Sequence, residues 1–112
     1  MKHPHAIVVH TLAVLALATL PAASALAADH VVSQKNKEFA LKALKIKVGD
    51  SIDFRNEDPF AHNVFSLSDA KAFDLGSYAQ GQSRKVLFDK AGKVEVECSI
   101  HPNMRLVVEV AP

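Results

Sequence analysis

Apolar and polar residues alternate over short runs of the chain from residue 44 onward. In the run 44–48 aliphatic residues alternate with lysines, and in the run 51–55 Ile52 and Phe54 alternate with polar residues. A period of two places one face of each run in a core and the other face in water. The pattern predicts two β-strands joined by a turn at Gly49-Asp50, and the second strand ends ahead of Pro59, which cannot donate a ladder hydrogen bond.

Four more runs share these features, and we expect strands at 63–67, 84–88, 93–98 and 105–110. The stretch 68–82 is polar and contains two glycines. We interpret it as a connector that crosses the outside of the sheet, with one helical turn near 70–73. Six or seven short strands with little helix predict an all-β protein built as a β-sandwich.

The first 27 residues differ from the rest of the chain. A weakly basic start with Lys2 leads into a long apolar stretch that ends at Ala25-Leu26-Ala27, a small-x-small sequence suited to signal peptidase. We therefore expect a secretory signal peptide over 1–27 and one exported domain over 28–112. An uncleaved membrane anchor remains the alternative. After cleavage we expect no stable membrane insertion.

Length and charge restrict the function further. A chain of 112 residues provides for one domain with one core. Lys and Arg total 13 against 12 Asp and Glu, and loss of Lys2 with the signal leaves 12 against 12. A nearly neutral domain lacks the basic surface that binding to nucleic acid or to anionic lipid requires. We expect neither of these partners.

Cys98 is the only cysteine of the chain. An oxidising compartment favours paired cysteines, so an unpaired one needs either protection or a function. Val94, Val96 and Cys98 share one face of the run 93–98, and the pleat of a strand directs that face into the core. An inert buried thiol is one interpretation. The residues that follow Cys98 favour a second one.

The segment Cys98-Ser99-Ile100-His101-Pro102-Asn103-Met104 places a thiol, an imidazole and a thioether in one short loop. This donor set suits copper, whereas zinc gains little from a thioether. A trigonal site needs a second imidazole, for which the domain offers His62 and His30. His62 stands at the entry to a predicted strand, whereas His30 lies beside the N-terminus of the domain, where fraying is normal. We favour His62.

The segments GDSIDFRNEDPFAHNV and CSIHPNM together resemble the cupredoxin family of blue-copper proteins. The C-x-x-H-x-x-M spacing is most similar to amicyanin and plastocyanin-like proteins. The resemblance implies an antiparallel Greek-key β-sandwich with one type 1 copper per chain, held by His62, Cys98 and His101 with Met104 as a weak axial ligand. It also implies that Asn63 donates its backbone N–H to the sulfur and ties the two ligand loops together through its side chain.

The resemblance implies one-electron transfer between exported redox partners in the periplasm, such as a cytochrome c and a periplasmic dehydrogenase. Copper storage or delivery is the alternative, although a strand-borne Cys98 and a loop closed by Pro102 favour retention of the metal. We do not expect an enzyme, because copper enzymes of this class add a second copper site with further histidines. We expect a monomer.

Overall fold

The computed structural model describes residues 2–17 and 26–112. Within these residues the chain forms nine β-strands and no helix. The strands are β1 (Asp29–Lys35), β2 (Glu38–Phe39), β3 (Ala43–Lys47), β4 (Ser51–Asn56), β5 (His62–Ser68), β6 (Lys71–Tyr78), β7 (Ser83–Leu87), β8 (Gly92–Cys98) and β9 (Arg105–Ala111).

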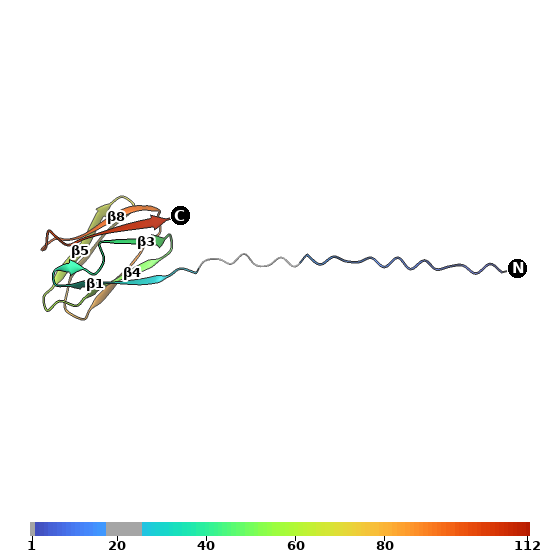
Figure 1. Cartoon of the computed structure of the whole chain (residues 1–112), viewed down its shortest axis with the longest axis horizontal. Helices are drawn as coiled ribbons and strands as arrows, with labels where there is room; N and C mark the ends of the chain where they lie inside the picture. The colour runs from blue at the N-terminus through green and yellow to red at the C-terminus, as the bar shows by residue number, and fades with distance from the viewer. Residues whose placement is uncertain (1, 18–25) are drawn as a thin grey trace.

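The strands form two sheets that face each other as a sandwich (Figure 1). One sheet has the order β2-β1-β4-β7 and the other has the order β3-β9-β8-β5-β6. Most neighbours are antiparallel, but β1 pairs with β4 and β3 pairs with β9 in parallel. The all-β sandwich is confirmed, whereas the antiparallel arrangement that the resemblance implied does not hold at these two pairs.

The core lies between the two sheets and follows the alternation of the sequence. In β8 the inward residues Val94, Val96 and Cys98 are buried, while Lys93 and Glu95 are exposed. Removing such alternating apolar faces from water contributes about 25 cal/mol per Å² of buried apolar surface. The other fully buried apolar side chains come from strands of both sheets and from the residue after β7: Val32, Ile52, Phe54, Val64, Leu106, Val108 and Phe88.

The prediction for residues 68–82 is wrong. This stretch contains no helical turn, and most of it is β6, which pairs with β5 at the edge of the larger sheet. Phe73 and Leu75 alternate with Ala72 and Asp74, and the two apolar side chains pack partly buried against the core. An edge strand needs only a short apolar face, so its polar content hides the pattern.

Sequence reasoning also missed β1 and β2, which form a hairpin around Asn36 and Lys37. Both turn residues have positive φ angles, 55° and 60°. Such a turn usually contains glycine, which tolerates positive φ without steric cost, so the usual sequence signal is absent here. The turn of this hairpin nevertheless contacts the candidate site, because the N–H groups of Asn36 and Lys37 donate to Asp58.

Of the predicted signal peptide, residues 1 and 18–25 lie outside the described part of the chain. Residues 2–17 are exposed and form no strand or helix. In the described residues no helix is both long enough and apolar enough to span a bilayer. The first strand starts at Asp29, and the cleavage site before it stays a prediction.

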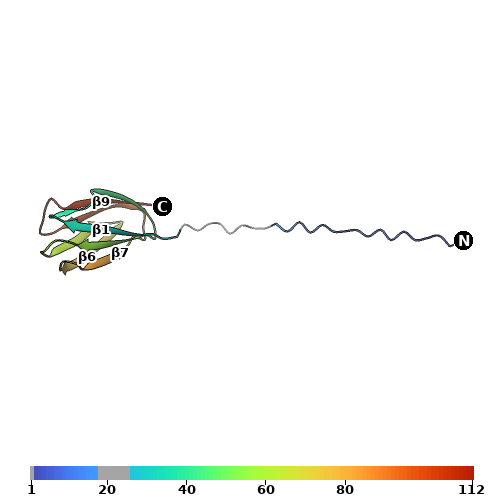
Figure 2. The same cartoon turned by 60° about the horizontal axis from the view of Figure 1, so that its bottom comes forward.

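The loops gather at the two ends of the sandwich (Figure 2). At one end, β1, β4 and β8 finish and β5 and β9 begin; we call this the ligand pole, because Cys98 and His62 lie there. At the other end, β1 and β4 begin and β9 finishes; we call this the terminal pole.

Candidate metal centre

Strand β8 and the loop after it position two of the candidate ligands. Cys98 is the last residue of β8 and its side chain is buried. The loop turns back at once, because the Met104 N–H donates to the carbonyl of His101 over 3.0 Å. This short turn brings the imidazole of His101 back over the thiol of Cys98.

The third candidate, His62, begins β5 and is completely buried. The loop that leads to it is held by Asn56, whose side-chain amide donates to the carbonyls of Phe60 at 2.8 Å and Tyr78 at 3.0 Å. Asn56 is itself fully buried at the end of β4. The polar turn after β4 therefore presents His62 in one fixed position.

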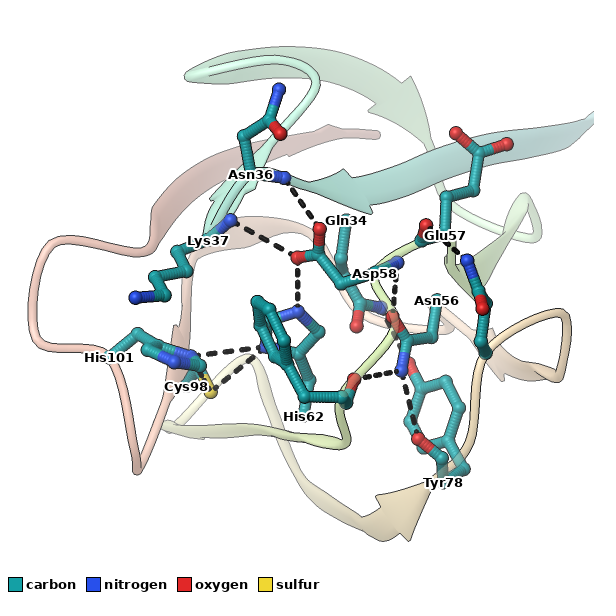
Figure 3. A network of polar contacts seen from close by, with 12 residues as sticks. Gln34, Asn36, Lys37, Asn56, Glu57, Asp58, His62, Tyr78, Cys98 and His101 are labelled. Carbon is teal, nitrogen blue, oxygen red and sulfur yellow. Dashed lines mark hydrogen bonds and ion pairs between the residues drawn. The ribbon is translucent and has the colours of Figure 1, made fainter.

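The three candidate ligand atoms meet at the ligand pole (Figure 3). Cys98 Sγ lies 3.7 Å from Nδ1 of His62 and 3.7 Å from Nδ1 of His101, and the two Nδ1 atoms are 3.2 Å apart. A point equidistant from the three atoms lies about 2 Å from each, close to the metal bond lengths of about 2.0–2.3 Å for such ligands. The donor set and its spacing therefore fit one metal ion.

Met104 stands at the end of the same loop. Its side chain is 1% exposed and belongs to the same buried cluster as Cys98. A buried thioether at this place is compatible with a weak axial contact as well as with core packing.

The other ring nitrogen of His62 is bound by Asp58. Nε2 of His62 lies 2.6 Å from Oδ2 of Asp58, and both side chains are buried (Figure 3). Burial raises the pKa of this carboxyl, but hydrogen bonds from His62, Lys37 and Asn36 outweigh burial and lower it below its ordinary value. Asp58 is therefore an ionised acceptor, so His62 carries its proton on Nε2 and directs the lone pair of Nδ1 toward Cys98.

Asp58 also holds the β1–β2 hairpin. Its carboxylate accepts the backbone N–H of Asn36 at 2.7 Å and of Lys37 at 3.1 Å. The hydrogen bonds thus connect this turn, through one carboxylate, to the imidazole of His62. Sequence reasoning did not identify this contact, because the two segments are more than twenty residues apart and nothing in either pattern indicates that they meet.

His101 lies nearer the surface than His62. Burial above all, together with the proximity of His62 and of the Lys37 ammonium group, lowers the pKa of His101 below its ordinary value, which favours the neutral, ligating form. The ring of Phe60 lies 5.6 Å from that of His101 and 5.4 Å from that of His62. Phe60 is 38% exposed, so it covers the two imidazoles at the rim of the site.

Asn63 ties the two ligand loops together, as the resemblance implied. The Ser99 hydroxyl donates to the Asn63 side-chain oxygen at 3.0 Å, and the Ser99 N–H donates to the Asn63 carbonyl at 3.1 Å. The implied hydrogen bond from the Asn63 N–H to Cys98 Sγ is not among the hydrogen bonds of the described residues. This second role stays a prediction.

His30, the alternative second imidazole, lies at the terminal pole. Its Nε2 is 3.0 Å from Oδ2 of Asp50, at the beginning of β1 and β4. The structure therefore brings His62, and not His30, to Cys98 and His101.

Comparisons with known proteins agree with this geometry. Residues 27–111 match a family described as copper binding proteins of the plastocyanin/azurin family. Methylamine utilization protein MauL of Methylorubrum extorquens is 33% identical over 93 residues, which cover 82% of this chain and 79% of MauL.

Solved structures show the same likeness. A copper(I) amicyanin variant with one methionine replaced by alanine is 26% identical, with a TM-score of 0.67, and the match covers 72% of this chain and 80% of amicyanin. A copper-containing nitrite reductase from Thermus scotoductus has 26% identity and a TM-score of 0.69, over 74% of this chain. This chain spans only 22% of that reductase.

Proposed function

Because the chain belongs to the plastocyanin/azurin family of copper-binding proteins and is similar to amicyanin among the cupredoxins, we propose that it carries single electrons between exported redox proteins. The observation that supports the proposal best is the triangle of one thiol and two imidazoles at the ligand pole. Its size suits a single ion, and its donor types suit copper in both oxidation states.

In this proposal the residues that would hold the copper ion are His62, Cys98, His101 and Met104. Bound copper would supply a one-electron couple between Cu(I) and Cu(II). The protein supplies rigidity: His62 is fully buried and fixed by Asp58, and Cys98 is fixed by β8. A ligand set that cannot rearrange lowers the cost of changing oxidation state, which favours fast electron exchange.

The electron would enter and leave through the exposed side of His101. Pro59, Phe60, Ile100 and Pro102 are exposed around it. A small rim of apolar side chains, with Lys37 beside Phe60, suits the brief encounters of redox proteins. The proposed donor and acceptor are redox proteins such as a cytochrome c or a periplasmic dehydrogenase, and the name of MauL associates that relative with methylamine utilization.

The same proposal includes export to the periplasm, with residues 1–27 removed as a signal peptide and residues 28–112 acting as a monomer. Copper storage or delivery is the competing function. Delivery requires ligands that an incoming partner can reach, whereas His62 and Cys98 are 0% and 4% exposed. Slow transfer of bound copper to a chelator would support electron transfer over delivery.

The test is to add one equivalent of Cu(II) to the purified protein and record the visible spectrum. We expect an intense blue thiolate-to-copper band, its loss in Cys98→Ser, and its retention in the matched control His30→Gln. Rapid electron exchange with a small redox dye should accompany the band. A His30→Gln protein that binds copper without colour, or that loses the copper to a chelator within seconds, would refute the electron-transfer assignment.

A further inference from the structure

The terminal pole carries a second group of nitrogen donors, at the start of β1. The backbone N–H of Ala28 donates to Oδ1 of Asp50 at 2.9 Å, and the ring of His30 contacts Oδ2 of the same carboxylate at 3.0 Å. The Lys47 N–H also donates to Oδ2 at 3.0 Å. One carboxylate thus gathers the first and third residues of the segment Ala28-Asp29-His30 at one place.

Cleavage after Ala27 would turn this segment into an N-terminal tripeptide with histidine in third position. A free α-amine, two backbone amide nitrogens and a histidine Nδ1 in that order can surround a metal ion in a plane through three fused chelate rings. Square-planar nitrogen sets of this kind select Cu(II) and Ni(II). Chain termini are commonly flexible, whereas here His30 is already oriented by the fold.

We propose that the processed N-terminus, Ala28-Asp29-His30, forms a second metal site that binds one Cu(II) or Ni(II) ion in a square plane of four nitrogens. The ligands are the α-amine of Ala28, the amide nitrogens of Asp29 and His30, and Nδ1 of His30. The proposal rests on the export included in the proposed function, because only cleavage after Ala27 creates the amine.

The orientation of His30 supports this assignment. Its Nε2 faces Asp50, and the same carboxylate accepts the backbone N–H groups of Ala28 and Lys47. An ionised carboxylate only accepts, so the ring donates Nε2–H to it and leaves Nδ1 as the basic nitrogen. Metal-bound histidines commonly donate their other ring N–H to a carboxylate in this way, and Asp50 provides that partner in advance.

The rest of the segment lies at the free end of β1, where its backbone would have to leave the extended conformation to reach the planar geometry. Ala28 and Asp29 are exposed and His30 is half-buried. The first two register pairs of β1 with β4 are Asp29 with Ser51 and His30 with Ile52, so we expect metal binding to displace these two pairs and to leave the ladder from Val31 onward intact. Val32, two residues beyond His30, is fully buried and anchors the remainder of β1.

Metal binding at this site releases protons and involves no oxidation or reduction. The α-ammonium of Ala28 releases one proton and the two amides release one each, so binding of one divalent ion liberates three protons. No electron is transferred and no other reactant is required. The site is also separate from the ligand pole, because the seven residues of β1 span about 20 Å at about 3.3 Å per residue.

The test uses the chain expressed with residues 1–112 and recovered after export, in a Cys98→Ser background that removes the thiolate from the ligand pole. Intact mass first establishes the N-terminus, which we expect at Ala28. Titration with Ni(II) should then give one equivalent of a yellow square-planar complex. Titration with Cu(II) should give one equivalent with a weak visible band and no thiolate band.

Two control variants carry the same background. His30→Gln removes the imidazole, and insertion of one glycine between Ala27 and Ala28 keeps His30 but moves it to fourth position. We expect each to weaken Ni(II) binding by at least about 100-fold. Unchanged affinity in either control, or a mass that shows a different N-terminus, would overturn the proposal. Absence of the blue band in the parent protein with retention of the Ni(II) site would refute only the proposed function.

Discussion

Replacing Asp58 by alanine should reveal how much one carboxylate contributes to the ligand pole. The substitution removes the acceptor for three donors, namely Nε2 of His62 and the N–H groups of Asn36 and Lys37. His62 is completely buried, so its orphaned N–H costs about 1–3 kcal/mol. Asn36 and Lys37 are exposed and can be hydrated, which limits the cost to about 0.5–1.5 kcal/mol each.

Together these losses amount to about 2–6 kcal/mol, a large part of the total of about 5–15 kcal/mol that stabilises a small domain. For a domain of this size about 1 kcal/mol shifts the melting temperature by about 4–8 °C. We therefore expect the copper-free Asp58→Ala protein to melt at least about 8 °C below the parent. Copper affinity should fall by about 10–100-fold, because His62 loses the partner that orients it.

The measurements are thermal and urea unfolding of the copper-free proteins by circular dichroism, followed by copper titration in competition with a chelator. Asp58→Asn is the matched control, since its amide oxygen can still accept and should retain part of the stability. A melting temperature within about 4 °C of the parent for Asp58→Ala, which corresponds to about 1 kcal/mol or less, would refute the reasoning.

Three further predictions concern other residues of the sandwich. Burial raises the pKa of Tyr78 above its ordinary value of 10.0, so Tyr78 ionises first in the unfolded chain, and the free energy of unfolding should fall as the pH rises above 10.0. Tyr78→Phe should lose this alkaline dependence in urea unfolding, and an equal dependence in both proteins would contradict the assignment. Met104→Leu conserves the buried volume and should lower the free energy of unfolding by less than about 1.5 kcal/mol. If the thioether is an axial ligand, the same substitution should raise the reduction potential measured by voltammetry, and an unchanged potential would mean that Met104 only packs in the core. Ile100, which is 57% exposed, has a backbone N–H, which a proline at this position would lack. We expect this N–H to donate a hydrogen bond to the Cys98 thiolate and so to stabilise the reduced site. Ile100→Pro should therefore lower the potential by about 40 mV for a hydrogen bond of about 1 kcal/mol, and a potential that did not fall would exclude that hydrogen bond.

The sequence by itself determined the features that depend on local pattern. Alternation of apolar and polar residues located six strands, and in β8 it placed Cys98 on the buried face. The spacing of Cys98, His101 and Met104 within one loop identified the candidate ligands, because a short loop brings its donors together whatever the rest of the fold is.

The tertiary structure alone decided what joins distant segments. Most of the stretch 68–82 forms the edge strand β6 because it pairs with β5. The alternation of apolar and polar residues within the stretch is too weak to predict this strand. Asp58 meets His62 and the turn at Asn36 and Lys37 only because β1 lies beside β4 in parallel. Hydrogen bonds between segments depend on register and strand order, which no local pattern encodes, so neither Asp58 nor the partnership of Asp50 with His30 could be found before the fold was known.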